Sequence, residues 1–202
     1  MTNYYYTKNP EVEHNEQTFN FTLLGNDLRF TTDNGVFSKR RVDFGSCVLL
    51  AALEETDFTA AKILDVGCGY GPLGLALAKK FASAKVDMVD VNELALSLAQ
   101  KNAQANQIEN VKIWPSDQYQ AVSDTDYTAI ITNPPIRAGK EVVHGILSQA
   151  KEHLVVGGSL TAVLQKKQGA PSAKKKMLEV FGNCEVIKKE KGYFILQSIK
   201  EA

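Results

Sequence analysis

The sequence of 202 residues has few of the features that mark export, membrane insertion or metal binding. Its three cysteines, Cys47, Cys68 and Cys184, lie far apart with no C-x-x-C pair, which indicates a reducing compartment and argues against structural zinc. Residues 1–6 have no basic flank leading into an apolar core, so no export signal is expected. No apolar run approaches the roughly 20 residues needed to span a bilayer. We therefore expect a cytoplasmic protein without a membrane partner or a bound metal.

Charge is balanced overall but uneven along the chain. Lys and Arg number 23, as do Asp and Glu, yet residues 151–202 hold 10 Lys against 5 acidic residues. Most of this excess comes from Lys166 and Lys167, from 174–176, and from 188–191. One interpretation is a solvated rim, and the other is a surface that contacts nucleic-acid phosphates. Composition alone leaves both open.

Strands and helices are predicted to alternate from residue 62 onward. The expected strands are 62–66, 85–90, 111–114, 128–132, 159–164, 184–188 and 193–199, and the expected helices are 72–81, 93–105, 141–153 and 176–181. This alternation predicts an α/β, Rossmann-like fold with a mostly parallel seven-stranded sheet and an antiparallel pair at its C-terminal edge. Short strands at 19–23, 28–31 and 36–38 predict a small β-rich extension over residues 1–45. A helix at 46–53 then opens the main domain, residues 46–202.

A glycine-rich turn, Asp65-Val66-Gly67-Cys68-Gly69-Tyr70-Gly71, links the first of these strands to a helix. Glycines there allow a ligand to approach the backbone closely. The spacing Gly69-x-Gly71-x-x-Gly74 also fits a dinucleotide fingerprint. However, Asp65 would repel a pyrophosphate, and Gly74 falls inside the predicted helix. A cationic amino-acid ligand suits Asp65 better, which favours S-adenosylmethionine (SAM) over NAD.

Acidic residues follow three successive strands. Asp90 ends the second strand, where a carboxylate can accept both hydroxyls of a ribose, and Val91 lies beside it. Asn92 can support the same sugar or cap the next helix, and capping is the preferred interpretation. Ser116-Asp117 follows the third strand, where Asp117 can accept from an adenine amino group or cap a turn. Together with Asp65, these positions predict a nucleoside-binding edge.

The fourth strand ends in Asn133-Pro134-Pro135-Ile136. Neither proline has a backbone N–H, and Pro134 forces Asn133 into an extended conformation, so the sheet cannot continue. The Asn133 amide oxygen and the Pro134 carbonyl are thereby held where α/β proteins bind ligands. Two acceptors so close together suit a planar –NH2 group. We predict that these four residues form the catalytic segment and that Asn133 also contacts the cofactor.

On these motifs the chain resembles class I SAM-dependent methyltransferases, and in particular the small-domain 16S ribosomal RNA guanine-N2 methyltransferases. The resemblance covers about residues 19 to 200 and rests on Gly35–Ser38, Asp43–Ser46, Asp65–Gly71, Asp90, Asn133–Pro135 and Gly192–Phe194. It implies that the glycine loop holds the methionine part of SAM, with the ribose at Asp90 and the adenine beside Asp117. It also implies that Asp43 to Ser46 closes over the cofactor, and Asp43 can cap the following helix as well.

The substrate side departs from the family in one place. Enzymes with this motif often carry an aromatic residue after the second proline, whereas Ile136 offers no π face. Phe37 is a candidate for stacking, although it can equally be a core residue. Arg137 and Lys140 are candidate phosphate contacts or solvated loop residues.

The resemblance implies methylation of guanine N2 in small-subunit ribosomal RNA, with ribosomal RNA or the small subunit as partner. The chemistry of the Asn-Pro-Pro segment leaves other amino groups open. These are adenine N6 in DNA or RNA, cytosine N4 and a protein glutamine amide. A non-catalytic module that binds SAM or RNA is the alternative from another class.

Overall fold

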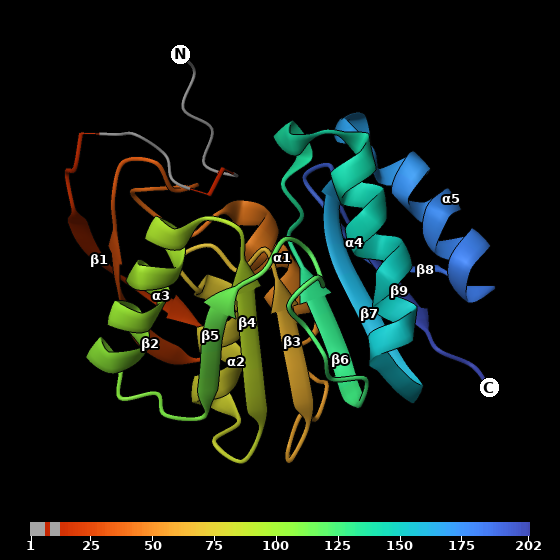
Figure 1. The fold of residues 1–202 in the computed structure, drawn as a ribbon, viewed down its shortest axis with the longest axis horizontal. Helices are drawn as coiled ribbons and strands as arrows, with labels where there is room; N and C mark the ends of the chain where they lie inside the picture. Colours follow the sequence, from red (N-terminus) through yellow and green to blue (C-terminus); the bar gives the residue numbers. More distant parts are fainter. Residues whose placement is uncertain (1–6, 9–12) are drawn as a thin grey trace.

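The computed structural model describes residues 7–8 and 13–202, and its central feature is a seven-stranded sheet (Figure 1). Residues 1–6 and 9–12 of the predicted extension lie outside the described residues. The strands are β3 (Lys62–Val66), β4 (Lys85–Asp90), β5 (Val111–Pro115), β6 (Tyr127–Thr132), β7 (Leu154–Gln165), β8 (Glu185–Glu190) and β9 (Tyr193–Ile199). Their order is β5-β4-β3-β6-β7-β9-β8. The first five are parallel, and β9 is antiparallel to both β7 and β8, which confirms the predicted α/β sheet and places β8 at the edge.

Helices cover both faces of the sheet. They are α1 (Phe44–Ala52), α2 (Pro72–Lys80), α3 (Glu93–Ala105), α4 (Lys140–His153) and α5 (Ala170–Phe181), with short 3-10 turns η1 (Ile136–Ala138) and η2 (Lys166–Gln168). Ile63 belongs to the core beneath α1, α2 and α3, whereas its neighbour Leu64 belongs to the core beneath α4 and α5. Because successive side chains of a strand point to opposite faces, a strand covered on both sides buries the side chains of both faces.

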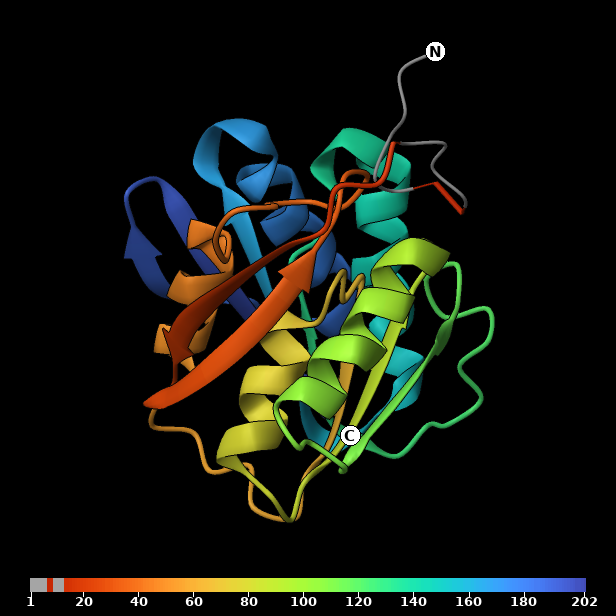
Figure 2. The ribbon, with the colours of Figure 1, turned by 90° about the vertical axis from the view of Figure 1, so that its left-hand side faces the viewer.

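A hairpin of β1 (Gln17–Leu23) and β2 (Asn26–Thr32) packs beside α2 and α3 (Figure 2). Asn102 of α3 holds it in place. Its Oδ1 accepts from Thr31 N at 2.7 Å, and its Nδ2 donates to the Thr31 carbonyl at 3.0 Å. Phe30 belongs to the same hydrophobic core as α2 and α3. The boundary at residue 45 stays a prediction.

Three elements differ from the sequence-based prediction in type or by more than two residues at one end. Residues 36–38 are bends rather than a strand, because Gly35 and Ser38 have φ of 87° and 57°, which breaks an extended chain. Helix α5 begins at Ala170 instead of residue 176, after a left-handed Gly169 and with Pro171 in its first turn. Strand β7 begins at Leu154, five residues before the predicted start.

The parallel strands bring their carboxyl ends to one edge of the sheet, the upper edge in Figure 1. Strand β3 has β4 on one side and β6 on the other, so the chain order reverses between β3 and β6. Open α/β sheets bind ligands in the crevice at such a switch point. Within the described ranges, every helix is too short or too polar to cross a membrane.

Candidate active site

A cavity of about 390 Å³ lies at the carboxyl ends of β3, β4 and β6. The predicted site residues on its wall are Phe37, Asp43, Ser46, Gly67, Cys68, Gly69, Asp90, Val91, Asn92, Ser116, Asp117, Asn133, Pro134, Pro135, Ile136 and Arg137. Three others, Asp65, Gly71 and Lys140, are not on the wall. The sheet therefore gathers segments from five regions of the chain around one space.

The Asn133 side chain is held in one orientation by the segment that precedes α1. Its Nδ2 donates to Asp43 Oδ2 at 3.0 Å and to Ser46 Oγ at 2.9 Å. Asp43 also caps α1, since its Oδ2 accepts from Ser46 N at 3.3 Å. An amide turned the other way would place its oxygen against the Asp43 carboxylate, which has no proton to donate. The Asn133 Oδ1 is consequently directed away from this pair, as an acceptor for another group.

The glycine loop is tied to the end of β4. Gly67 N and Cys68 N donate to the Val89 carbonyl at 2.9 and 3.0 Å. Gly69 N donates to Asp90 Oδ2 at 2.8 Å, and Asn92 N donates to Asp90 Oδ1 at 2.9 Å. Burial raises the pKa of Asp90, and these N–H groups partly offset that rise. Asp90 thus presents a carboxylate of fixed orientation to the cavity.

Gly71 ends the loop and precedes α2 in a left-handed conformation, with φ of 98°. A Cβ on this residue would lie 2.8 Å from Leu75 Cδ1. The residue must therefore be glycine for two reasons, backbone conformation and close packing. Its role is to shape the loop rather than to contact a ligand.

Asp65 corrects one sequence-based expectation. It is fully buried beneath the loop, and its Oδ2 accepts from Gly74 N of α2 at 2.9 Å. The alternation of side chains along β3 turns Asp65 toward α2 and away from the cavity. Its carboxylate therefore does not face the space where a ligand ammonium would lie. Its Oδ1 is buried without a hydrogen-bond partner among the described residues. Burial, together with the nearby Asp90 charge, raises the pKa of Asp65 to about 7.

Two polar residues of the wall have their side chains engaged in local structure. Asn92 Oδ1 accepts from Ala95 N at 3.1 Å and its Nδ2 donates to the Gly35 carbonyl at 3.0 Å, which supports the capping interpretation. Ser116 Oγ donates to the Gln118 carbonyl at 2.9 Å and accepts from Ala121 N at 3.0 Å. Asp117, by contrast, is exposed at the cavity edge.

Sequence reasoning missed six polar residues on the wall: Ser38, Tyr70, Gln118, Gln165, Gln168 and Tyr193. Tyr70 donates to the carbonyls of Ser38 and Arg41 at 3.3 and 3.4 Å, and thereby holds the loop that carries Phe37. The available signal for Gln165 was its place at the end of the fifth predicted strand, the position at which the other site residues were recognised.

The residues of this cavity fit SAM. Asp90 presents on the wall a carboxylate that can accept from the hydroxyls of a ribose, and the exposed Asp117 lines the same cavity. Asp65 lies off the wall, so its buried carboxylate can favour a cationic ligand only through its charge and not by contact. A glycine loop, an acid at the second strand end and an Asn-Pro-Pro turn on this sheet together define a class I SAM-dependent methyltransferase.

Comparison with known proteins identifies the family within that class. Residues 27–197 match the sequence model of the methyltransferase small domain, and the chain belongs to this family. It is 49% identical over 201 residues to the uncharacterized protein YbxB of Bacillus subtilis, covering 99% of this chain and 100% of that one. It is 30% identical over 196 residues to ribosomal RNA small subunit methyltransferase C of Vibrio cholerae, covering 94% of this chain.

A solved structure shows the same relationship. The 16S rRNA N2 methyltransferase RsmC of T. thermophilus, in complex with AdoMet and guanosine, superposes with a TM-score of 0.84 at 28% identity, covering 92% of this chain. The chain is thus an RsmC-like, SAM-dependent methyltransferase by fold and family. It spans 55% of the Vibrio relative and 51% of the Thermus structure, about half the length of each.

Proposed function

We propose that this protein transfers a methyl group from SAM to the exocyclic N2 amino group of a guanine in small-subunit ribosomal RNA. The observation that carries the proposal is the fixed amide of Asn133. Asp43 and Ser46 bind its nitrogen, so its oxygen is an acceptor beside the cavity that Asp90 and the glycine loop also line. The guanine and ribosomal parts of the proposal are supported by the RsmC relatives.

The chain supplies orientation and electrostatics. SAM, when bound, provides a methyl group on a sulfonium, which is already electrophilic. The Asn133 Oδ1 and the Pro134 carbonyl would accept the two N–H bonds of the acceptor and point its lone pair at the methyl carbon. They also stabilise the positive charge that develops on nitrogen. The extra proton then leaves to solvent, so no strong base is needed, and no histidine is among the described residues of the wall.

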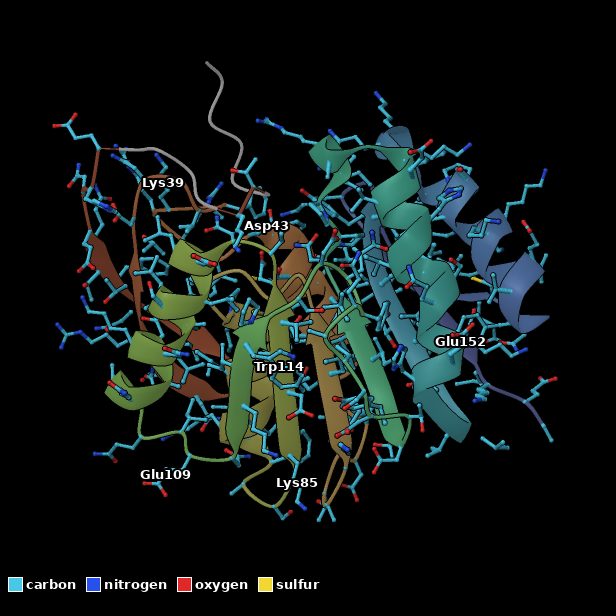
Figure 3. All side chains as sticks on the ribbon, viewed as in Figure 1. Lys39, Asp43, Lys85, Glu109, Trp114 and Glu152 are labelled. Atoms are coloured by element: carbon cyan, nitrogen blue, oxygen red, sulfur yellow. The ribbon has the colours of Figure 1, made fainter. Side chains whose placement is uncertain are left out.

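Cationic side chains surround this edge of the sheet and support an RNA partner. They are Lys39, Arg40 and Arg41 before α1, Arg137 and Lys140 around η1, Lys166 and Lys167 in η2, and Lys191 in the β8–β9 turn, all exposed. We refer to these eight residues as the basic rim. Figure 3 places Lys39 and Asp43 near this edge, and Lys85 and Glu109 at the opposite one. Such a rim would position RNA phosphates without reading sequence.

The target base needs an apolar contact as well. Phe37 is 46% exposed on the cavity wall, while Ile136 is half-buried there. A flipped or unpaired base would stack on the Phe37 ring and pack against Ile136. Phe37 would thereby replace the aromatic residue that related enzymes carry after the second proline.

The test is transfer of tritiated methyl from SAM to naked ribosomal RNA, small ribosomal subunits, DNA and release-factor protein in parallel. Label on RNA, recovered as N2-methylguanosine by mass spectrometry, is the expected result. Asn133→Ala should lose transfer and keep SAM affinity, whereas Asn20→Ala, an exposed asparagine of β1, should retain both. Label on adenine or on protein would redirect the proposal to those acceptors. SAM binding without transfer to any substrate would leave only a binding module.

A further inference from the structure

The part of the cavity wall that β7 and β9 contribute carries a hydrogen-bonded pair to which the cofactor site described above assigns no role. Gln165 ends β7 and Tyr193 begins β9, and they face each other in the register of the two strands. The Gln165 Nε2 donates to the Tyr193 hydroxyl at 2.6 Å. Both side chains are half-buried and line the cavity.

Packing places this pair next to the Asn133 amide. A Cβ on Gly45, the second residue of α1, would lie 2.8 Å from Tyr193 Cε1 and 2.9 Å from Asp43 Oδ2. The Tyr193 ring and the Asp43 carboxylate therefore flank the same point, and Asp43 in turn binds the Asn133 nitrogen at 3.0 Å. Because Thr132 pairs with Ala162, Gln165 also lies alongside the Asn-Pro-Pro turn.

The pair offers an acceptor and a donor side by side. Since the Gln165 nitrogen donates to Tyr193, the Gln165 Oε1 is the acceptor. The Tyr193 hydroxyl accepts that bond and retains its own hydrogen to donate to another group. A ligand with a hydrogen-bond donor next to a hydrogen-bond acceptor would complement this arrangement, its donor facing Gln165 and its acceptor facing Tyr193.

We propose that Gln165 and Tyr193 read the Watson–Crick edge of the target base and select guanine. This inference rests on the proposed function, because it assumes that the target amino group lies at Asn133 and Pro134. In guanine, the 2-amino group is followed by the N1–H donor and the O6 acceptor. Gln165 Oε1 would accept from N1–H, and the Tyr193 hydroxyl would donate to O6. Both contacts lie on the ring edge that a flipped base exposes.

The competing amino groups lack this order. Adenine N6 and cytosine N4 both adjoin a ring nitrogen that is an acceptor, and the amide nitrogen of glutamine adjoins a carbonyl oxygen. Each would place an acceptor against the Gln165 oxygen, and pairing it would require the Gln165 amide to turn over and its bond with the Tyr193 hydroxyl to reverse, so the arrangement in the structure favours guanine. Gln165 and Tyr193 thus distinguish between methyl-accepting groups that the Asn-Pro-Pro turn alone would bind equally well.

The experiment measures nucleoside affinity in the complex with S-adenosylhomocysteine by calorimetry. The probes are guanosine, adenosine and 2,6-diaminopurine riboside, which keeps the 2-amino group but has an acceptor at N1 and a donor at position 6. We expect the wild type to bind guanosine about tenfold to a hundredfold more tightly than the diaminopurine riboside. Gln165→Ala should lower that ratio about fivefold to tenfold through weaker guanosine binding, and the Tyr193 contact to O6 should account for the preference that remains.

Matched variants separate recognition from folding. Gln197→Ala removes a half-buried glutamine of β9 that bonds Thr161 outside the cavity, and should leave the ratio unchanged. Gln165→Glu keeps an acceptor oxygen and should retain most of the guanosine preference. Tyr193→Phe should weaken guanosine binding and leave that of the diaminopurine riboside nearly as it was. Affinity for S-adenosylhomocysteine, measured in the same titrations, reports whether each variant is folded.

Two results would overturn the inference. One is a wild type that binds the diaminopurine riboside or adenosine as well as guanosine, and the other is a Gln165→Ala variant with the wild-type ratio. Either result leaves the proposed function standing if the wild type still methylates ribosomal guanine. Conversely, absence of methyl transfer to RNA would refute the proposed function without touching the nucleoside ratios.

Discussion

Replacing Asn133 by aspartate would test the acceptor geometry most directly. The substitution Asn133→Asp preserves shape, but it puts a carboxylate oxygen where the amide nitrogen now lies, 3.0 Å from Asp43 Oδ2. Two unit charges at that separation repel by about 5.5 kcal/mol at an effective dielectric constant of about 20. Asn133 is half-buried, so screening by solvent makes this an upper limit.

This repulsion predicts a change in pH dependence. A like charge raises the pKa of the introduced carboxyl, because the neutral form removes the repulsion. The protonated carboxyl donates to Asp43 as the amide N–H does, and its second oxygen remains an acceptor for the substrate. Below the raised pKa the wild-type arrangement is restored, and above it the two carboxylates repel and the acceptor is displaced. The activity of the variant relative to wild type should therefore rise as pH falls.

The assay is the initial rate of methyl transfer at saturating SAM between about pH 5.5 and about pH 8.5, expressed as variant over wild type. Dividing by the wild type removes titrations common to both proteins, including that of Asp65. We expect a loss of about a hundredfold at the alkaline end, comparable to removal of one oriented catalytic dipole, and recovery of about tenfold at the acid end. Asn133→Ala should stay inactive throughout. A ratio that is constant, or that increases with pH, would refute the reasoning.

The remaining predictions concern the cofactor and the RNA. Asp90→Ala should weaken SAM binding about tenfold to a hundredfold in calorimetry, since a hydrogen bond to a charged group is lost, and unchanged affinity would remove Asp90 from the ribose role. The pKa of Asp65 is raised to about 7, so its carboxylate is ionised above that pH. The affinity for cationic SAM should therefore fall as the pH drops below about 7, and SAM binding near that pH should release a proton from Asp65. Asp65→Asn should abolish both effects. Replacing both Lys166 and Lys167 by glutamate should weaken RNA binding and reduce the slope of log K against log salt concentration by about two. Lys85→Glu, at the opposite edge of the sheet, should change that slope less. Equal effects would argue against the basic rim.

Most of the fold was predictable because local patterns carry it. The short, mostly apolar run of β4 and the capping signal at Asn92 gave the strand Lys85–Asp90 and the helix Glu93–Ala105 with the observed limits. Errors arose where local signals compete with distant contacts. Residues 36–38 resemble a strand locally, yet the Tyr70 hydroxyl bonds the carbonyl of Ser38 and the segment folds over the cavity instead.

The membership of the site was predictable in the same way. Residues that follow parallel strands share one edge of the sheet, so Asp90, Asp117 and Asn133 had to lie near each other once the alternation was recognised. What strand order does not give is the direction in which each side chain points. Asp65 follows the same rule of position but is turned under α2, where it accepts from Gly74 N.

By itself, the sequence determined that this protein has a parallel sheet, a glycine loop for SAM and an Asn-Pro-Pro turn with two acceptors. The tertiary structure alone decided how those acceptors are used. The Asn133 amide is oriented by Asp43, 90 residues earlier, and the neighbouring wall is formed by Gln165 and Tyr193, 28 residues apart. Hydrogen bonds between distant residues depend on which strands and helices become neighbours. Periodicity fixes the elements, but only their packing brings these partners within bonding distance.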